Sequence, residues 1–233
     1  MNFTAFFVFN LPCGIEKNWK SYIMELSLRK WELWMKGGVA LAQGMKAIAW
    51  GSLGAMLVFR ILYQAEAKGL FFTLAITAGT VAYHFWMRLL VGGIFDRWMK
   101  NKADYHRKWF RVGKAEEKFY ELLRVNRWKR FFPTYDPKVF DRRQHTWDEI
   151  AQATCQSELV HETIVLLSFL PILASFWFGA AGVFVLTSLC SALFDLLFVV
   201  IQRYNRPRIL KILSKRKRPE SRRSKENEYE PCT

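Results

Sequence analysis

Cysteine is scarce in this sequence, and its spacing excludes two kinds of site. The four cysteines form no CxxC pair and lack the density of a secreted disulfide scaffold, so we expect free thiols. The opening stretch MNFTAFFVFNLPCG also lacks a leading basic residue and a small-residue cleavage pattern. It is too short to span a bilayer, so we expect it to be retained and to lie at the membrane interface. The cysteines are Cys13, Cys155, Cys190 and Cys232.

Acidic residues are few beside basic ones, with 20 Asp and Glu against 35 Lys and Arg and a formal net charge of +15. Such a surplus is typical of nucleic-acid-binding proteins, because clustered cations neutralise phosphates. Here the cations flank long apolar runs, where the positive-inside rule places them. Anionic lipid or an anionic donor substrate is therefore the simpler partner, and we expect no nucleic acid.

Three apolar regions predict an all-α, polytopic membrane protein with about four transmembrane helices. The first two spans cover residues 38–63 and 70–95. The third region, 163–201, is too long for one crossing, and Gly179 and Gly182 mark a reversal that divides it. Because each half is near the minimum length for a span, a re-entrant hairpin stays open as an alternative.

The apolar runs also divide the chain into segments. An even number of spans puts the Lys-rich and Arg-rich segments on one side, so we expect both termini in the cytoplasm and the protein in the cell membrane. The segments are an interfacial amino-terminal part (1–37), a first transmembrane hairpin (38–95), a basic cytoplasmic loop or helical lid (96–160), a second transmembrane hairpin (161–208) and a disordered basic tail (209–233).

Five local predictions follow from the residue pattern. Residues 18–36 carry tryptophans among basic residues, which favours an amphipathic helix in the headgroup region. Residues 116–125 favour a helix, and PTYDP favours an ordered turn after it. Pro207 is expected to end the last helix at about Arg206. The tail from about Leu213 onward has too few large apolar residues to offset the entropy of ordering, so we expect disorder there.

Ionisable side chains at the start of the third apolar region form the first candidate site. Glu158, His161 and Glu162 share one helix face. In the simpler interpretation the glutamates are helix-start charges with His161 hydrogen-bonded between them. In the functional interpretation His161 is a general base on a substrate hydroxyl, and one of the glutamates fixes its tautomer.

Asp195 lies within the last apolar run, where a buried carboxylate needs a partner. The candidates on neighbouring spans are His84, Arg88 and His161. Snorkelling towards the membrane surface explains Arg88, one helical turn after His84, but does not explain His84. We therefore include both residues in the candidate site.

The string IQRYNRPR ends the last span with three arginines among amide and phenol side chains. This set suits bidentate binding of phosphate or carboxylate groups. Charge alone favours the alternative, ordinary anchoring at the membrane surface. The basic and aromatic stretch 127–132 suits that surface or the phosphates of an acyl donor. The predicted substrate-binding residues are Arg88, Lys129, Gln202, Arg203, Tyr204, Asn205, Arg206 and Arg208.

These motifs carry a family resemblance. The region from about Trp128 to Leu210, with WKRFFPTYDPKVFDRR, CQSELVHETIVLLSFLP and IQRYNRPRIL, resembles the glycosyl-4,4'-diaponeurosporenoate acyltransferases of staphyloxanthin-type carotenoid synthesis. The resemblance implies transfer of a fatty acyl group to a sugar hydroxyl of a membrane glycolipid at the inner leaflet. The residues that match those shared by the family are Glu158, His161, Gln202, Arg203, Tyr204, Asn205, Arg206 and Arg208.

Our leading hypothesis is therefore a membrane O-acyltransferase with a glycolipid acceptor, an acyl-CoA or acyl carrier protein donor, and no cofactor. A metal-dependent enzyme is an alternative, because Glu-x-x-His occurs in di-metal bundles, but the sequence has one ELVH and no repeat. A non-enzymatic lipid-binding or assembly subunit is another. The predicted catalytic residues are His84, Glu158, His161, Glu162 and Asp195, with no metal ligands.

Overall fold

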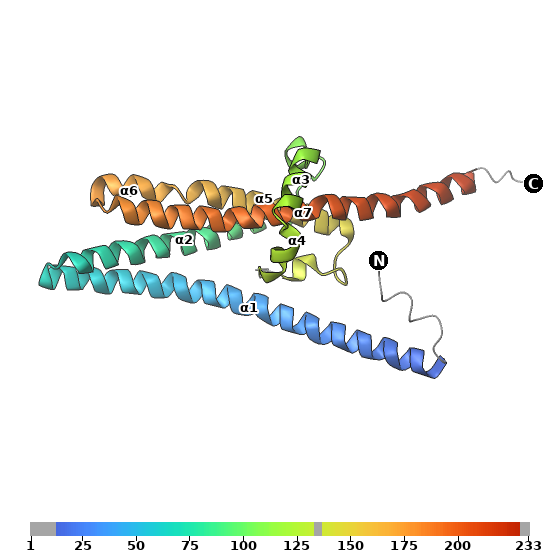
Figure 1. Cartoon of the computed structure of the whole chain (residues 1–233), viewed down its shortest axis with the longest axis horizontal. Helices are drawn as coiled ribbons and strands as arrows, with labels where there is room; N and C mark the ends of the chain where they lie inside the picture. Colours follow the sequence, from blue (N-terminus) through green and yellow to red (C-terminus); the bar gives the residue numbers. More distant parts are fainter. Residues whose placement is uncertain (1–12, 133–136, 229–233) are drawn as a thin grey trace, which may run out of the picture.

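The computed structural model describes residues 13–132 and 137–228, and within these ranges the protein is all-α without strands. Two long helical hairpins lie side by side (Figure 1). Part of the turn predicted at PTYDP falls in residues 133–136, which lie outside the described ranges. The first hairpin consists of α1 (Cys13–Glu66) and α2 (Gly69–Met99), and the second of α5 (Trp147–Leu167), α6 (Leu170–Phe178) and α7 (Ala181–Glu228).

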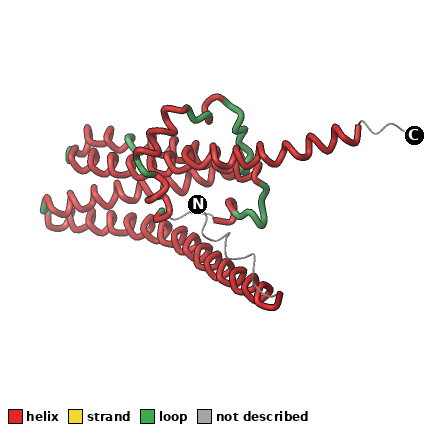
Figure 2. Tube along the Cα trace, turned by 45° about the vertical axis from the view of Figure 1, so that its right-hand side comes forward, coloured by secondary structure: helices red, strands yellow, loops and turns green. Residues whose placement is uncertain are grey.

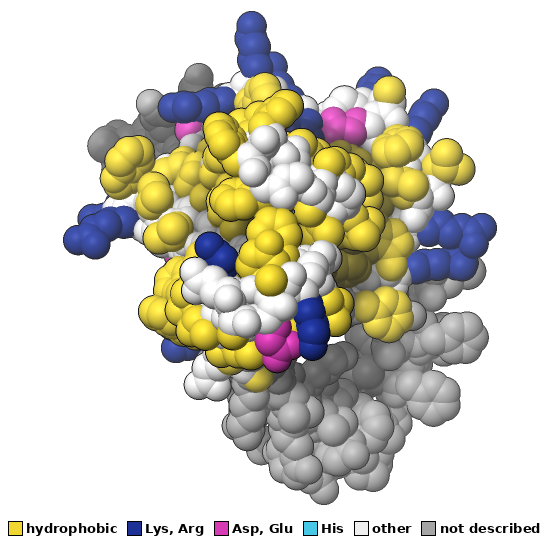
Figure 3. Space-filling model, turned by 90° about the vertical axis from the view of Figure 1, so that its left-hand side faces the viewer, with side chains coloured by type: hydrophobic (Ala, Val, Ile, Leu, Met, Phe, Trp, Pro, Cys, Tyr) yellow, Lys and Arg dark blue, Asp and Glu magenta, His cyan; other side chains and the backbone are white. Residues whose placement is uncertain are grey.

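Four helical stretches are long and apolar enough to cross a membrane, which confirms a multi-pass membrane protein. The helical stretches that contain the two halves of the third apolar region are 32 and 36 residues long, which favours two crossings over a re-entrant hairpin. Large apolar side chains face outward, as in Trp50 and Phe176, which are 62% and 83% exposed. Figure 3 views the end with the helical reversals and shows mainly hydrophobic side chains on the described surface. The stretches are Ala40–Glu66, Gly69–Met99, Trp147–Phe178 and Ala181–Arg216.

The reversal between α6 and α7 lies where the glycine pattern predicts it. Gly179 and Ala180 both have positive φ angles, 65° and 50°. This left-handed conformation is accessible to glycine without a steric penalty, so Gly179 permits the tight turn. Gly182, the second glycine of the predicted reversal, already belongs to α7.

A break between α5 and α6 is tied to the first hairpin by one hydrogen bond. Pro171 has no backbone N–H, so it leaves the carbonyl of Leu167 without its helical donor. The Tyr83 hydroxyl of α2 donates to that carbonyl at 2.9 Å. Inside a bilayer an unpaired carbonyl is costly, so Tyr83 both satisfies the break and joins the two hairpins.

Residues 100–132 and 137–146, which we call the lid segment, cover α5 and α7 at the end of the bundle opposite the reversals (Figures 1 and 2). Phe110 packs against Cys155 of α5, and Tyr120 packs against Tyr204 of α7. Thr146 ends the segment as the cap of α5, in a reciprocal capping box with Glu149. The lid helices are η1 (Lys108–Phe110), α3 (Lys114–Leu122), α4 (Val125–Trp128), η2 (Lys129–Phe131) and η3 (Pro137–Phe140).

Two predictions about the last helix are wrong for the described residues. α7 neither ends at Arg206 nor gives way to a disordered tail, because it continues through Pro207 to Glu228. Pro207 removes only one helical hydrogen bond, and Arg203 and Arg206 hold the turn that precedes it through contacts to other elements. Lys, Arg and Glu are good helix formers, and extending an existing helix needs no new nucleus.

Two of the remaining predictions hold in part. The helix expected at 116–125 is present as α3, which begins two residues earlier and ends at Leu122. Residues 18–36 are helical but form one continuous helix with the first span, within α1.

Candidate functional site

A cavity of about 1280 Å³ lies between the two hairpins. Its walls come from α1, α2, α5 and α7, with Phe132, Val139 and Phe140 of the lid segment. Most of the lining is hydrocarbon, and polar side chains interrupt it. The cavity brings together more than half of the predicted site residues, namely His84, Arg88, Lys129, His161, Asp195, Gln202 and Asn205.

Asp195 lies at the centre of the polar part of this cavity. Its side chain is 1% exposed, and it accepts a hydrogen bond from Arg88 Nη2 at 2.5 Å. Its other oxygen lies 2.9 Å from His161 Nδ1. Two of the three predicted partners are therefore confirmed, and the paired cation compensates for the burial of the carboxylate.

The same contact bears on the tautomer of His161. A carboxylate accepts a hydrogen bond from an N–H, so the tautomer of the neutral ring that suits this contact carries its hydrogen on Nδ1 and its lone pair on Nε2. Phe198 stacks on the imidazole, with ring centroids 4.7 Å apart and planes within 10°. The stacked Phe198 ring and the Asp195 carboxylate thus fix the plane of the imidazole and occupy its Nδ1 side.

Arg88 is fixed by groups from two helices. Besides Asp195, it donates to Ser191 Oγ at 2.8 Å and to the carbonyl of His84 at 3.0 Å. Ser191 Oγ lies 2.9 Å from Ser168 Oγ, which extends the network to the end of α5. Sequence reasoning missed Ser191, although it precedes Asp195 by four residues and so faces the same side of α7.

Glu158 and Glu162 do not contact His161 as predicted. Glu158 is fully buried and accepts from Arg203 Nη1 at 2.6 Å and from Arg206 Nη2. Glu162 accepts from the indole N–H of Trp109 at 3.0 Å. Residues that share a helix face can still contact different neighbouring elements. The partner of His161 is Asp195 of α7, not a residue of its own helix.

Arg203 and Arg206 are engaged by internal groups, which corrects the prediction that they hold the donor. Arg206 is fully buried and donates to the carbonyl of Phe110 at 3.1 Å as well as to Glu158. Arg203 donates to Glu116 Oε1 at 2.5 Å, and this hydrogen bond lowers the pKa of Glu116. The two arginines thus fasten the lid segment to α5 and α7.

Tyr120 completes this cluster, which we call the lid ion-pair cluster. Its hydroxyl donates to Glu116 Oε1. Burial raises the pKa of Tyr120, and the hydrogen bond to Glu116 raises it further. The phenol therefore stays neutral and keeps its proton for that hydrogen bond. The cluster consists of Glu116, Tyr120, Glu158, Arg203 and Arg206.

Lys129 and Asn205 form the lid end of the large cavity. Lys129 Nζ donates to Asn205 Oδ1 at 2.7 Å and lies 4.8 Å from the centroid of the Tyr204 ring. Burial lowers the pKa of Lys129, and the charge of Arg208 adds to this effect. Gln202 lines the same part of the cavity.

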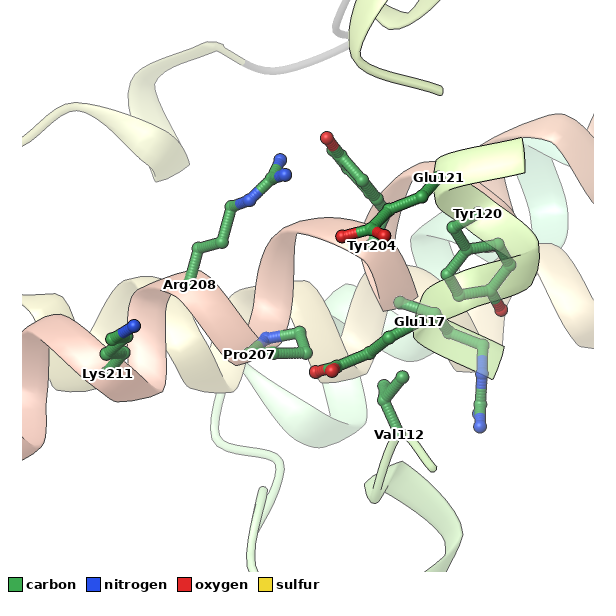
Figure 4. A pocket seen from close by; sticks show the side chains of 9 residues that line it. Val112, Glu117, Tyr120, Glu121, Tyr204, Pro207, Arg208 and Lys211 are labelled. Atoms are coloured by element: carbon green, nitrogen blue, oxygen red, sulfur yellow. The ribbon is translucent and has the colours of Figure 1, made fainter. Parts of the chain in front are cut away.

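Tyr204 and Arg208 lie beside a second, smaller pocket of about 290 Å³ between α3 and α7 (Figure 4). The guanidinium of Arg208 lies 3.8 Å from the centroid of the Tyr204 ring. Glu117 and Glu121 of α3 face this pocket together with Lys211. Arg208 is therefore separated from the cavity that holds His161.

No group of three or more His, Cys, Asp or Glu side chains suited to a metal ion occurs in the part of the chain that the structure describes. The two described cysteines on the second hairpin, Cys155 and Cys190, are free thiols as expected.

The comparisons with known proteins give one match. The family model of glycosyl-4,4'-diaponeurosporenoate acyltransferase matches residues 101–215. This region contains most of the lid segment, α5, α6 and the membrane part of α7, and with them His161 and Asp195. No curated protein and no solved structure matches the chain.

Proposed function

Because the chain belongs to the glycosyl-4,4'-diaponeurosporenoate acyltransferase family, we propose that it transfers a fatty acyl group from a thioester donor to a hydroxyl of a glycosylated lipid at the cytoplasmic leaflet. The chain is thus an acyltransferase, not a non-enzymatic subunit. The observation that carries the mechanism is the contact between His161 and Asp195, paired to Arg88, in the wall of a large apolar cavity.

In this proposal His161 is the general base. Its Nε2 takes the proton of the acceptor hydroxyl as the oxygen attacks the carbonyl carbon of the donor. The C–O bond of the new ester forms, the C–S bond breaks, and the leaving thiolate receives the proton from Nε2. Asp195 holds the ring and stabilises the imidazolium between these two transfers.

Arg88 acts through Asp195. Its guanidinium compensates the charge of the buried carboxylate, and its contacts to Ser191 and to the backbone of α2 fix the geometry. Through its terminal nitrogens Arg88 is therefore a positioning residue in the proposed reaction.

The cavity suits two lipid substrates. Its apolar walls lie between membrane-spanning helices and can hold hydrocarbon chains, while the polar groups lie towards the lid segment. We propose that Lys129, Gln202 and Asn205 contact the polar part of the donor, because they line the lid end of the cavity. Acyl-CoA and acyl carrier protein both present a thioester on an anionic carrier, which suits the cation of Lys129.

Charge supports the cytoplasmic assignment. The two reversals opposite the lid segment carry Glu66 and Lys68 in the first hairpin and no charge at Gly179–Ala180. The lid segment and the end of α7 are rich in Lys and Arg. The positive-inside rule then places the lid segment in the cytoplasm, where activated acyl donors are made.

The test is acyl transfer by the purified full-length chain in lipid nanodiscs. Labelled palmitoyl-CoA is supplied with glycolipid extracted from cells that lack this chain, and labelled ester is measured. We expect His161→Ala to lose about 10²–10⁴-fold in turnover. Glu162→Gln is the matched control, one residue away and outside the cavity lining, and should retain turnover. Equal turnover by His161→Ala and wild type would overturn the proposal.

A further inference from the structure

His84 is a buried polar side chain without a partner in the part of the chain that the structure describes. It is 4% exposed, and neither Nδ1 nor Nε2 has a hydrogen bond. A buried imidazole that makes no hydrogen bond is costly, so such a residue calls for an explanation. Its ring lines the same cavity as His161.

Arg88, which lines the same cavity, adds a third unsatisfied atom. Its Nε is buried and has no partner, although its terminal nitrogens bind Asp195, Ser191 and the carbonyl of His84. Other buried groups without partners, such as Trp86 Nε1 and Ser188 Oγ, do not line the cavity. Among the buried side chains with an unsatisfied nitrogen or oxygen in the described part of the chain, His84 and Arg88 are thus the ones that also line this cavity.

The hydrogen-bonding capacity of these atoms selects the ligand. A neutral imidazole offers one donor and one acceptor, and Arg88 Nε offers another donor. A thioester carbonyl only accepts, so it leaves the acceptor nitrogen of His84 unpaired. A hydrocarbon chain satisfies none of the three atoms. Neighbouring hydroxyl groups both donate and accept, so a carbohydrate ring can satisfy all three.

We infer that His84, together with Arg88 Nε, binds the carbohydrate headgroup of the acceptor and presents one of its hydroxyls to His161. The inference rests on the proposed acyl transfer and adds the subsite that selects a hydroxylated acceptor. His84 comes from the first hairpin and His161 from the second, so the acceptor lies between the two hairpins. The first hairpin lies outside the region matched by the family model, and this subsite is a contribution of residues before 101.

The test measures binding separately from turnover. Octyl β-glucoside, below its micellar concentration, is titrated into the full chain in phosphatidylcholine nanodiscs by calorimetry. Its per-O-methylated analogue has the same ring and chain without a hydroxyl donor. The inference predicts that wild type binds the glucoside at least about tenfold more tightly than the analogue.

Three variants decide the role of His84. His84→Phe keeps a ring but removes both nitrogens, and should weaken glucoside binding about tenfold while raising the acceptor KM and leaving the donor KM unchanged. His84→Gln keeps a donor and an acceptor and should restore much of the binding. Trp86→Phe removes an unpaired N–H outside the cavity lining and should bind as wild type does.

The outcomes separate this inference from the proposed function. Equal glucoside binding by wild type and His84→Phe would overturn the inference, and loss of transfer in His161→Ala would still support the acyltransfer mechanism. Full acyl transfer by His161→Ala would overturn the proposed mechanism, even if His84→Phe weakens glucoside binding. Unchanged binding but altered donor KM in His84→Phe would assign His84 to the donor and also overturn the inference.

Discussion

Asp195 and His161 meet between α7 and α5, with the carboxylate oxygen 2.9 Å from Nδ1 of the ring. The carboxylate is almost fully buried and is also paired with Arg88. A base oriented by a buried carboxylate is an arrangement suited to moving a proton from a hydroxyl. The contact links the second hairpin internally, and Arg88 links it to the first.

Asp195→Asn removes the charge of this residue and keeps the shape of its side chain. The variant removes the partner of the buried Arg88, so we expect destabilisation by about 3–5 kcal/mol together with loss of transfer. Combining it with Arg88→Met removes both charges and should recover most of the stability but none of the activity. Thermal unfolding and transfer assays in nanodiscs measure the two effects. A double variant that regains transfer would contradict the role of Asp195.

Glu158→Gln should release the lid segment. The substitution leaves Arg203 and Arg206 without their shared buried carboxylate, which should cost about 3–5 kcal/mol of stability. Limited proteolysis should then cut more rapidly within residues 100–146. Glu162→Gln, whose partner is the exposed Trp109, serves as the control. Equal cleavage of both variants would argue against the lid ion-pair cluster as the contact that attaches the lid segment to α5 and α7.

The attachment of the lid segment should also depend on pH. The pKa of Glu116 is lowered from its ordinary value of 4.5, chiefly by the hydrogen bond from Arg203. A depressed carboxyl pKa contributes stability that is present above the ordinary value and is lost as pH falls through the lowered pKa. Hydrogen exchange of α3 should therefore accelerate in this acidic window, and Glu116→Gln should reduce that dependence. The same pH dependence of hydrogen exchange in wild type and Glu116→Gln would contradict the role of Glu116 in attaching the lid segment.

Tyr83→Phe tests the connection between the hairpins. Pro171 leaves the Leu167 carbonyl without a helical donor, and the substitution also removes the hydrogen bond from the Tyr83 hydroxyl. The loss should lower the stability of the folded protein by about 1 kcal/mol in the membrane. Tyr63→Phe is a suitable control, because its hydroxyl has no hydrogen bond among the described contacts. Thermal unfolding in nanodiscs measures both, and a smaller loss for Tyr83→Phe than for Tyr63→Phe would contradict this account.

The sequence predicts the spans and part of the site for a common physical reason. Hydrocarbon tolerates few charges, so a lone Asp195 in an apolar run must find a cation or a histidine on a neighbouring span. The sequence leaves His84, Arg88 and His161 as candidates, and the structure pairs Asp195 with Arg88 and His161. The reversal at Gly179 is predictable because glycine reaches the left-handed conformation without penalty.

The remaining contacts depend on helix rotation and lid packing, which local patterns do not encode. Glu158 and His161 share a helix face, yet the rotation of α5 directs Glu158 to Arg203 and Arg206. The donor role predicted for those arginines fails because the folded lid segment supplies carbonyls and Glu116 as their partners. Ser191 could have been found from its spacing of four residues to Asp195.

Chemical rescue tests the central claim most directly. His161→Ala, folded and still able to bind octyl β-glucoside, is assayed for acyl transfer with increasing imidazole, which can enter a cavity of about 1280 Å³. If His161 is the base, transfer should return in proportion to the neutral form of imidazole and rise with pH through its pKa. Absence of rescue in a variant that still binds acceptor and donor, or full activity without imidazole, would contradict the account.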